Sequence, residues 1–383
     1  MAPRAERRRL RVLVCPQEFK GSLTAEEATR AIAAGVGRAL PEAEVREAPM
    51  ADGGPGTARL VCAAAGGRMV EGRWRGPLGE PAESAYALLP DGTAVVEAAT
   101  TAGLLLVPPA RRDPSLASTY GVGEQLRDAL RRGSRRVVVG VGGTATNDGG
   151  AGAAQALGYR LLDREGRELP PGGLALARLA RIESGEAEPR LREVEVRVAV
   201  DVTNRLLGPE GATAVYGPQK GATPDLAPRL EAALARWAER CLLDLGIEIA
   251  AVEGGGAGGG LAAGLVAVAG GRIESGAALV ARAVGLAERI AAADLVVTGE
   301  GQVDAQTVYG KTVAHVADLA RAAGRPCLVV AGAVEGIPDG IAAVERATPV
   351  GTAPEEAVAR AGELVAAAAE RLLRRYVTAT GGA

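Results

Sequence analysis

Aromatic side chains are scarce in this chain of 383 residues: two Trp, six Tyr and one Phe make up 2% of it. A hydrophobic core must therefore consist mainly of Ala, Val and Leu, and with 48% hydrophobic residues the chain is long enough for two domains. The longest apolar runs, such as 364–369, are far too short to span a bilayer, and we expect no signal peptide, because only a short apolar run, 12–15, follows the basic residues 1–11. A formal net charge of −2 makes a nucleic-acid or membrane-surface partner unexpected.

Thiol and imidazole groups are also rare. The four cysteines have no C-x-x-C spacing and are expected to be small core residues in a reducing, cytoplasmic compartment: Cys15, Cys62, Cys241 and Cys327. The single histidine, His315, lies within a helical run, where it is expected to pack or to face solvent. The sequence therefore offers no basis for a metal-thiolate site or for a Ser-His-Asp hydrolase, which would also need a G-x-S-x-G motif.

Lysine is almost absent, although Lys and Arg together number 44. The three lysines are Lys20, Lys220 and Lys311, and each adjoins a glycine. In a chain that otherwise uses Arg, a retained Lys marks a place where a compact ammonium group is needed. A flexible backbone beside a point charge suits phosphate binding. Chance survival on a solvated surface is the alternative; we favour it for any one lysine, but not for all three.

The segment 137–158 (VVVGVGGTATNDGGAGAAQALG) predicts a strand, a glycine-rich loop and a helix. Glycines let backbone N–H groups turn toward one point, and the start of a helix adds positive potential, so the loop can hold an anion. A tight turn of any α/β protein would give the same glycines. The adjacent pair Asn147 and Asp148 favours a binding function, because both side chains could reach the contents of the loop.

The two ends of the chain resemble each other in pattern, since strands such as 10–15 and 294–298 each lead into a polar loop and a helix. From residue 68 the pattern changes to alternating, hairpin-like strands. We therefore predict an α/β fold of two unlike domains. A parallel, doubly wound, flavodoxin-like domain would comprise residues 1–67 plus 284–383, and an inserted α/β domain would comprise 68–283, with the active site in the cleft between.

Acidic residues follow several predicted strands. Phosphoryl transfer needs oxygen ligands for a divalent ion and a base for the attacking hydroxyl group. Taken singly, each acid is more typical of a helix cap or a turn, so only the set favours phosphoryl transfer. The set consists of Asp52, Asp148, Asp201, Glu300 and Asp304.

Two other classes of function remain open at this point. Residues 140–145 match the dinucleotide-binding pattern G-x-G-x-x-A, with Asp163 about 20 residues further on. A nicotinamide-dependent dehydrogenase is therefore one alternative, although the glycines at 149, 150 and 152 interrupt the expected helix. A non-catalytic binder of small anions is the other, although it would not need so many carboxylates. The glycine-rich segment 254–260 predicts a loop that is mobile or lies against a ligand.

These motifs resemble the bacterial glycerate kinase family over about residues 11–376. The resemblance is carried by PQEFKGSLTA (16–25), MADGGPGT (50–57), GVGGTATNDGGAG (140–152), AVDVTNRLLGPEGA (199–212), GPQKGAT (217–223), the glycine-rich 254–264 and TGEGQVDAQTVYGK (298–311). It implies ATP- and Mg²⁺-dependent phosphorylation of glycerate, at the 2-hydroxyl group to give 2-phosphoglycerate. A glycerate 3-kinase is the alternative, and both a monomer and a homodimer remain open.

The chain departs from the family pattern in three motifs. The usual Pro-Asp-Ser-Phe-Lys is Pro-Gln-Glu-Phe-Lys here, with Gln17 and Glu18. Pro55 replaces a usual glutamate, and Asp-Val-Asp-Asn-Pro becomes Asp-Val-Thr-Asn-Arg, with Thr203. The loss of these acids could alter how metal or substrate is held, but all three lysines remain.

The resemblance and the residues together give a set of expected roles. Asp201 is expected to take the proton of the attacking hydroxyl group, assisted by the other catalytic residues, Lys20 and Lys311. The expected substrate-binding residues are Ser22, Asp52, Gly53, Gly54 and Asn204. The expected nucleotide- or phosphate-binding residues are Gly142, Gly143, Thr144, Asn147, Asp148 and Lys220. The expected Mg²⁺ ligands are Glu300 and Asp304.

Overall fold

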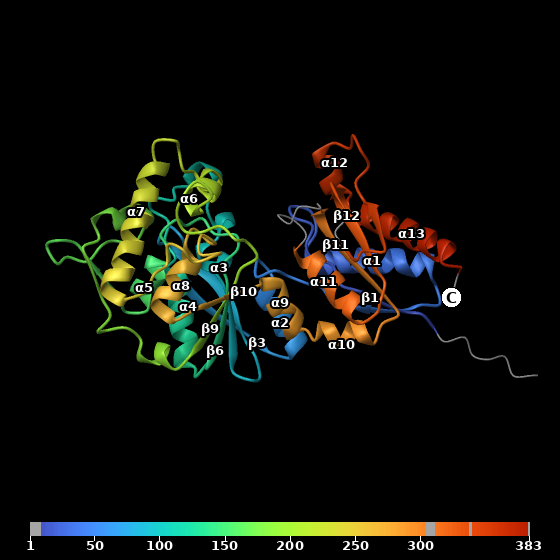
Figure 1. Cartoon of the computed structure of the whole chain (residues 1–383), viewed down its shortest axis with the longest axis horizontal. Helices are drawn as coiled ribbons and strands as arrows, with labels where there is room; N and C mark the ends of the chain where they lie inside the picture. The colour runs from blue at the N-terminus through green and yellow to red at the C-terminus, as the bar shows by residue number, and fades with distance from the viewer. Residues whose placement is uncertain (1–8, 304–310, 337–338, 382–383) are drawn as a thin grey trace, which may run out of the picture. The chain divides into compact units, whose positions relative to one another are not determined.

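A computed structural model describes residues 9–303, 311–336 and 339–381 of the chain (Figure 1). Its internal contacts divide the chain into two compact units. Unit 1 comprises Met1–Ala51 and Val280–Ala383, and unit 2 comprises Asp52–Leu279. Both are mixed helix–sheet structures, which confirms the predicted α/β class. The helix over 57–65, grouped with the terminal segments by the sequence, contacts strands of unit 2 instead.

Unit 1 is built on a five-stranded sheet in which every neighbouring pair of strands is parallel. The strand order is β13-β12-β11-β1-β2, which is 2-1-3-4-5 read from the other edge when only this unit's strands are counted. The strands are β1 (Arg11–Val14), β2 (Glu44–Glu47), β11 (Leu295–Val303), β12 (Cys327–Val334) and β13 (Ala343–Arg346). This order is that of flavodoxin-like folds, in which ligands bind where the order reverses, here between β1 and β11.

Helices cover both faces of this sheet. They are α1 (Ala25–Ala39), α10 (Leu286–Ala291), α11 (Lys311–Ala322), α12 (Pro354–Ala359) and α13 (Ala361–Ala379). Helix α13 lies beside α1, and α11 packs on the other side of β11 and β12 (Figure 1). Because side chains alternate along a strand, Leu328 and Val330 enter the core under α13, whereas Val329 enters the core under α11.

Unit 2 contains a six-stranded sheet in the order β10-β9-β6-β5-β4-β3, and β7 pairs with β8 in a separate hairpin. The strands are β3 (Arg68–Arg75), β4 (Pro81–Leu88), β5 (Thr93–Glu97), β6 (Arg136–Gly140), β7 (Arg160–Leu162), β8 (Arg181–Glu183), β9 (Glu195–Ala199) and β10 (Arg272–Glu274). Strands β3, β4 and β5 are antiparallel neighbours, whereas β5, β6, β9 and β10 run parallel. The carboxyl ends of the parallel strands thus share one edge of the sheet.

The helices of unit 2 are mostly short. They are α2 (Thr57–Ala65), α3 (Ala99–Ala102), α4 (Tyr120–Arg131), α5 (Ala151–Ala156), α6 (Ala212–Tyr216), α7 (Ala227–Arg240), α8 (Leu261–Ala269) and α9 (Gly276–Ala283), the last of which continues into unit 1. Helix α7 is followed directly by a π-helical turn over Cys241–Leu245. Five 3₁₀ turns complete the unit: Leu104–Leu106, Pro109–Arg111, Gly173–Arg178, Pro189–Arg192 and Pro218–Lys220.

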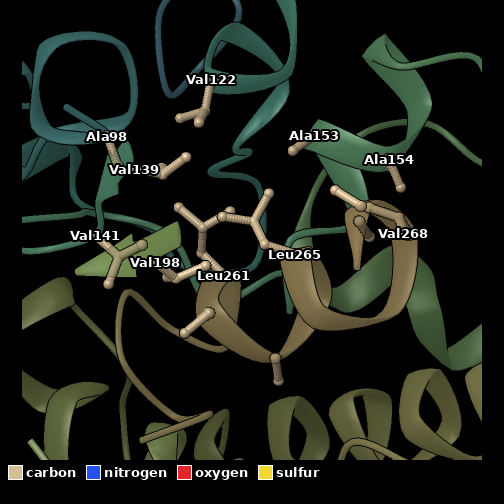
Figure 2. Close-up of a cluster of buried hydrophobic side chains, with 14 of the residues drawn as sticks. Ala98, Val122, Val139, Val141, Ala153, Ala154, Val198, Leu261, Leu265 and Val268 are labelled. Atoms are coloured by element: carbon tan, nitrogen blue, oxygen red, sulfur yellow. The ribbon is translucent and has the colours of Figure 1, made fainter. Parts of the chain in front are cut away.

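The core of unit 2 is aliphatic, as the shortage of aromatic residues predicts. Leu261 and Leu265 of α8 lie against Val139 of β6 and Val198 of β9, and all four side chains are buried (Figure 2). This packing brings the glycine-rich segment before α8 next to the loop after β6. Among the helices of the described residues, none combines the length and apolar character needed to cross a lipid bilayer.

Candidate functional site

Two glycine-containing loops of unit 2, over 52–57 and after β6, contact each other backbone to backbone. A Cβ atom on Gly142 would lie 3.1 Å from the Cα of Gly54, and one on Gly140 would collide with the carbonyl of Gly53. Gly53 and Gly143 both have positive φ, of 91° and 73°. These positions therefore need glycine for close approach and for backbone conformation. The structure thus brings together glycines that the sequence predicted separately, one set as substrate-binding and the other as phosphate-binding.

A buried carboxylate, that of Glu97, holds the 52–57 loop through hydrogen bonds, and it was not among the residues predicted from the sequence. Glu97, at the end of β5, accepts hydrogen bonds from the backbone N–H groups of Gly56, at 3.1 Å, and Ala58. Burial raises the pKa of Glu97, and the two hydrogen bonds act in the opposite direction. The only sequence signal for this role is that a glutamate is the last residue of a hydrophobic strand.

Asp52 and Asp201 both lie at the start of α9. The Asp52 carboxylate accepts a hydrogen bond from the Gly54 N–H at 3.0 Å. A Cβ on Gly276 would lie 3.0 Å from Oδ2 of Asp201 and would collide with the Asp52 carbonyl. The glycine at 276 therefore allows the two aspartates to approach the same backbone turn, although they are distant in sequence.

Asp201 caps α9. Its Oδ1 accepts hydrogen bonds from Oγ of Ser275 at 2.8 Å and from the N–H of Gly276 at 3.1 Å, and its Oδ2 accepts one from the N–H of Ala277 at 2.9 Å. These hydrogen bonds fix the orientation of the carboxylate. The sequence predicted Asp201 but not Ser275; a Ser-Gly pair before a run of helix-forming residues was the available signal.

The Asn147–Asp148 pair does not project from its loop. Both side chains are 0% exposed. Asp148 accepts hydrogen bonds from the N–H groups of Thr119, Gly150 and Gly152 and from the Thr119 hydroxyl group, at 2.8–3.2 Å. Burial raises the pKa of Asp148, and these hydrogen bonds counteract it. Asp148 therefore holds the loop against the starts of α4 and α5, which is a supporting role rather than direct contact with a ligand.

Lys220 is buried in the same region, with 3% of its surface exposed. Its Nζ donates to the Thr146 carbonyl at 2.7 Å and to Oγ1 of Thr144 at 3.1 Å. Burial lowers the pKa of Lys220 to about 7, although the negative charge of Asp148 acts to raise it. Lys220 thus forms one internal hydrogen-bond network with Thr144 and Thr146 of the loop that follows β6.

Asn147 and Asn204 both use their amide groups within the protein. The Asn147 amide donates to Oγ1 of Thr213 at 3.0 Å. The Asn204 amide donates to the Glu210 carbonyl at 2.8 Å, and its Oδ1 accepts from the Tyr216 hydroxyl group at 2.6 Å. Asn204, expected to bind substrate, therefore closes the loop between β9 and α6.

The segment 254–260 is packed rather than open, which corrects the expectation of a mobile or ligand-contacting loop. Six of its seven residues are buried. A Cβ on Gly259 would lie 2.9 Å from the Cα of Asn147, and one on Gly258 would lie 2.9 Å from the Val141 carbonyl. These glycines are needed because the segment covers the loop after β6 at backbone contact distance.

Unit 1 contains a pocket of about 320 Å³ at the carboxyl ends of its parallel strands. Its lining includes Lys20 and Ser22 from the loop after β1, and Glu300 from β11. Strands β1 and β11 are the two between which the strand order reverses. Ser22 donates from Oγ to the Phe19 carbonyl at 2.9 Å, whereas Thr24 caps α1. We call this cavity the unit 1 pocket.

The remaining predicted residues of unit 1 are Asp304 and Lys311. Lys311 is the first residue of α11. Asp304 lies outside the described residues. Within the part of the chain that the structure describes, no group of three or more His, Cys, Asp or Glu side chains is arranged to hold a metal ion.

Known proteins share this sequence and fold. The family model of the glycerate kinase family matches residues 12–377. A glycerate kinase of Halalkalibacterium halodurans is 45% identical over 324 residues, which are 84% of this chain and 85% of that protein. The glycerate 2-kinase of Escherichia coli strain K12 is 39% identical over 326 residues, 85% of this chain and 86% of the relative.

A solved structure shows the same likeness in three dimensions. The crystal structure of a candidate glycerate kinase 2 from Salmonella typhimurium LT2 superimposes with a TM-score of 0.84 at 39% sequence identity. The match covers 98% of this chain and 100% of the other. The sequence motifs, the fold and these relatives agree, and the chain therefore belongs to the glycerate kinase family and is a phosphotransferase.

Proposed function

We propose that this enzyme transfers the terminal phosphoryl group of ATP to the 2-hydroxyl group of glycerate and releases 2-phosphoglycerate. The observation that carries the choice of hydroxyl group is the 39% identity with a relative named glycerate 2-kinase, over most of both chains. A glycerate 3-kinase is the alternative product assignment. Family membership argues against the dehydrogenase and the non-catalytic anion binder. We propose a cytoplasmic location, in line with the free cysteines.

The proposed chemistry assigns a role to each unit. In unit 2, Asp201 accepts the proton of the attacking hydroxyl group, because it is an oriented, partly exposed carboxylate at the carboxyl end of β9. The backbone N–H groups around Gly53 and Gly142 offer donors for a phosphoryl or carboxylate oxygen. In unit 1, Lys20 neutralises phosphate charge, and Lys311 is proposed for the same task.

The donor set suits Mg²⁺ bound together with a nucleotide. Mg²⁺ at phosphoryl-transfer sites is commonly held by one or two carboxylates, water and the phosphates themselves. Glu300, which lines the unit 1 pocket, would supply such a carboxylate, with Asp304 as the second proposed ligand. Bound Mg²⁺ would neutralise the charge on the β- and γ-phosphates.

The test is incubation of the full chain with ATP, Mg²⁺ and D-glycerate, followed by ³¹P NMR of the product. We expect the phosphate-monoester signal of 2-phosphoglycerate, dependent on both ATP and Mg²⁺. A signal from 3-phosphoglycerate would replace the proposal by the 3-kinase alternative. Absence of any product with either enantiomer of glycerate would refute the assignment of substrate.

A further inference from the structure

Two chemically different groups of residues line the unit 1 pocket. One group is polar and includes Lys20 and Glu300, at the strand ends already described. The other group is aliphatic and comes from α12 and the start of α13, with Val358, Leu364 and Val365. At about 320 Å³ the pocket is at the lower end of the range of roughly 300–1,000 Å³ typical of sites that enclose a small organic ligand.

Glycerate does not match the aliphatic residues of this pocket. Each of its carbon atoms carries oxygen, so placing it against Val358 and Leu364 would desolvate polar groups without hydrogen-bond partners. A purine base has two apolar faces, and aliphatic side chains can cover them. The phosphoryl donor is therefore the ligand whose chemistry fits both the polar and the aliphatic residues of the pocket.

Arg346 lies on the same lining and was not singled out by the sequence. It is the last residue of β13, is exposed, and donates from Nε to the Thr348 carbonyl at 2.7 Å. Within the described parts of the chain, its two terminal guanidinium nitrogens have no hydrogen-bond or ion-pair partner. This arrangement leaves two donors for a phosphate oxygen on a guanidinium that is already held in place.

The geometry points to the unit 1 pocket as the binding site for the nucleoside end of the phosphoryl donor. The base lies against the aliphatic residues of α12 and α13, and Arg346, at the end of β13, binds a phosphate. The inference rests on the proposed function for the identity of the donor. It assigns new binding residues: Val358, Leu364 and Arg346.

The variant Val358→Asp tests whether the aliphatic residues of the pocket bind the base, and Val350→Asp is its control. Val358 is 50% exposed and lines the pocket, whereas Val350 is 84% exposed and does not line it. Both variants add the same charge at a surface valine, so both are expected to fold. We expect Val358→Asp to raise the KM for ATP about tenfold or more, with kcat and the KM for glycerate within about twofold of wild type. Val350→Asp should match wild type.

Direct binding separates this inference from the proposed function. Calorimetry with adenosine and with a non-hydrolysable ATP analogue needs no turnover. We expect Val358→Asp to weaken the binding of both ligands, because both contain the base. Arg346→Met should weaken the binding of the analogue about tenfold but leave that of adenosine unchanged, since only the analogue carries phosphate. If Val358→Asp misfolds, the comparison of Arg346→Met with wild type still tests whether the pocket binds the phosphates of the donor.

The outcomes that would overturn the inference are specific. If Val358→Asp and Val350→Asp bind both ligands equally well, the pocket does not hold the nucleoside. If Val358→Asp raises only the KM for glycerate, the pocket holds the acceptor instead. If wild-type enzyme fails to phosphorylate glycerate, the proposed function fails, while the adenosine titrations still decide the nucleoside site.

Discussion

Two Lys-Gly pairs of this chain have the same sequence pattern but opposite environments. Lys20 of unit 1 is exposed at a pocket, and Gly21 after it has a φ of 76°, with open space where a Cβ would lie. Lys220 of unit 2 is buried, and a Cβ on Gly221 would collide with the Arg112 carbonyl. A lysine beside glycine is therefore as compatible with an internal network as with a ligand site.

The same contrast holds for the loops around these lysines. In unit 1 the loop after β1 lines a cavity, so its polar groups face a space that a ligand can fill. In unit 2 the loop after β6 is covered by 254–260, and its polar groups form hydrogen bonds with other segments of the unit, through Thr213 and Lys220. Substitutions in unit 2 should therefore act mainly on stability, and those in unit 1 mainly on binding.

The largest effect on stability should come from Gly259→Ala in unit 2. Both Gly259 and Gly21 have positive φ, of 69° and 76°, but a Cβ on Gly259 would collide with the Thr146 carbonyl. We expect the free energy of unfolding to fall by roughly 3–5 kcal/mol for Gly259→Ala and by about 1 kcal/mol for Gly21→Ala, where only backbone strain arises. Urea unfolding measures both. Equal losses would show that the two loops are packed alike.

Asp148→Asn should have the next largest effect. An amide nitrogen cannot accept the hydrogen bonds that two carboxylate oxygens accept from Thr119, Gly150 and Gly152, so buried donors lose partners. We expect a loss of about 3 kcal/mol in the free energy of unfolding, measured with urea. Asp113→Asn is the matched control, because its Oδ1 alone accepts from Ser115 and an Asn carbonyl can replace it. A stable Asp148→Asn variant would refute the supporting role.

Asp201→Asn tests whether a residue of unit 2 acts in the reaction as well as in the fold. We expect kcat to fall by a factor of about 10², with the affinity for ATP unchanged, because the amide cannot accept a proton. Ser275→Ala is the control: it removes one hydrogen bond to Asp201 but leaves the carboxylate, so kcat should stay within about tenfold of wild type. If Asp201→Asn keeps the kcat of wild type, Asp201 is not the catalytic base and its role is only to cap α9.

Lys220→Met should change how stability depends on pH. In the folded protein burial lowers the pKa of Lys220 to about 7 from 10.5, so between these values the unfolded chain holds a proton that the folded chain has released. The stability of wild type relative to Lys220→Met should therefore rise with pH across this window, by at most about 1.4 kcal/mol per pH unit.

Denaturant titrations at several pH values measure this slope. Lys20→Met, which alters an exposed lysine, is the control and should follow the pH dependence of wild type. If the stability of Lys220→Met has the same pH dependence as that of wild type, Lys220 is charged and accessible in the folded protein. The two lysines would then not differ in environment.

The sequence predicted much of the fold because its signals are local. The alternation of 68–89 and the strand–loop–helix of 137–158 correspond to β3, β4, β6 and α5. The local sequence gives little sign of the break between α12 and α13 at Arg360, since no proline lies there and only Gly362 disfavours a continuous helix. Arg346 was missed among many arginines, since only its position on a pocket distinguishes it.

By itself the sequence determined the α/β class, the family and the positions of the glycine-rich loops, because periodicity and motif spacing depend on neighbouring residues. Only the tertiary structure decided which polar side chains face a cavity. Asn147, Asp148 and Lys220 are buried because segments distant in sequence, Thr119, Thr213 and Gly259, pack around them. Burial depends on such long-range packing, which no local pattern records.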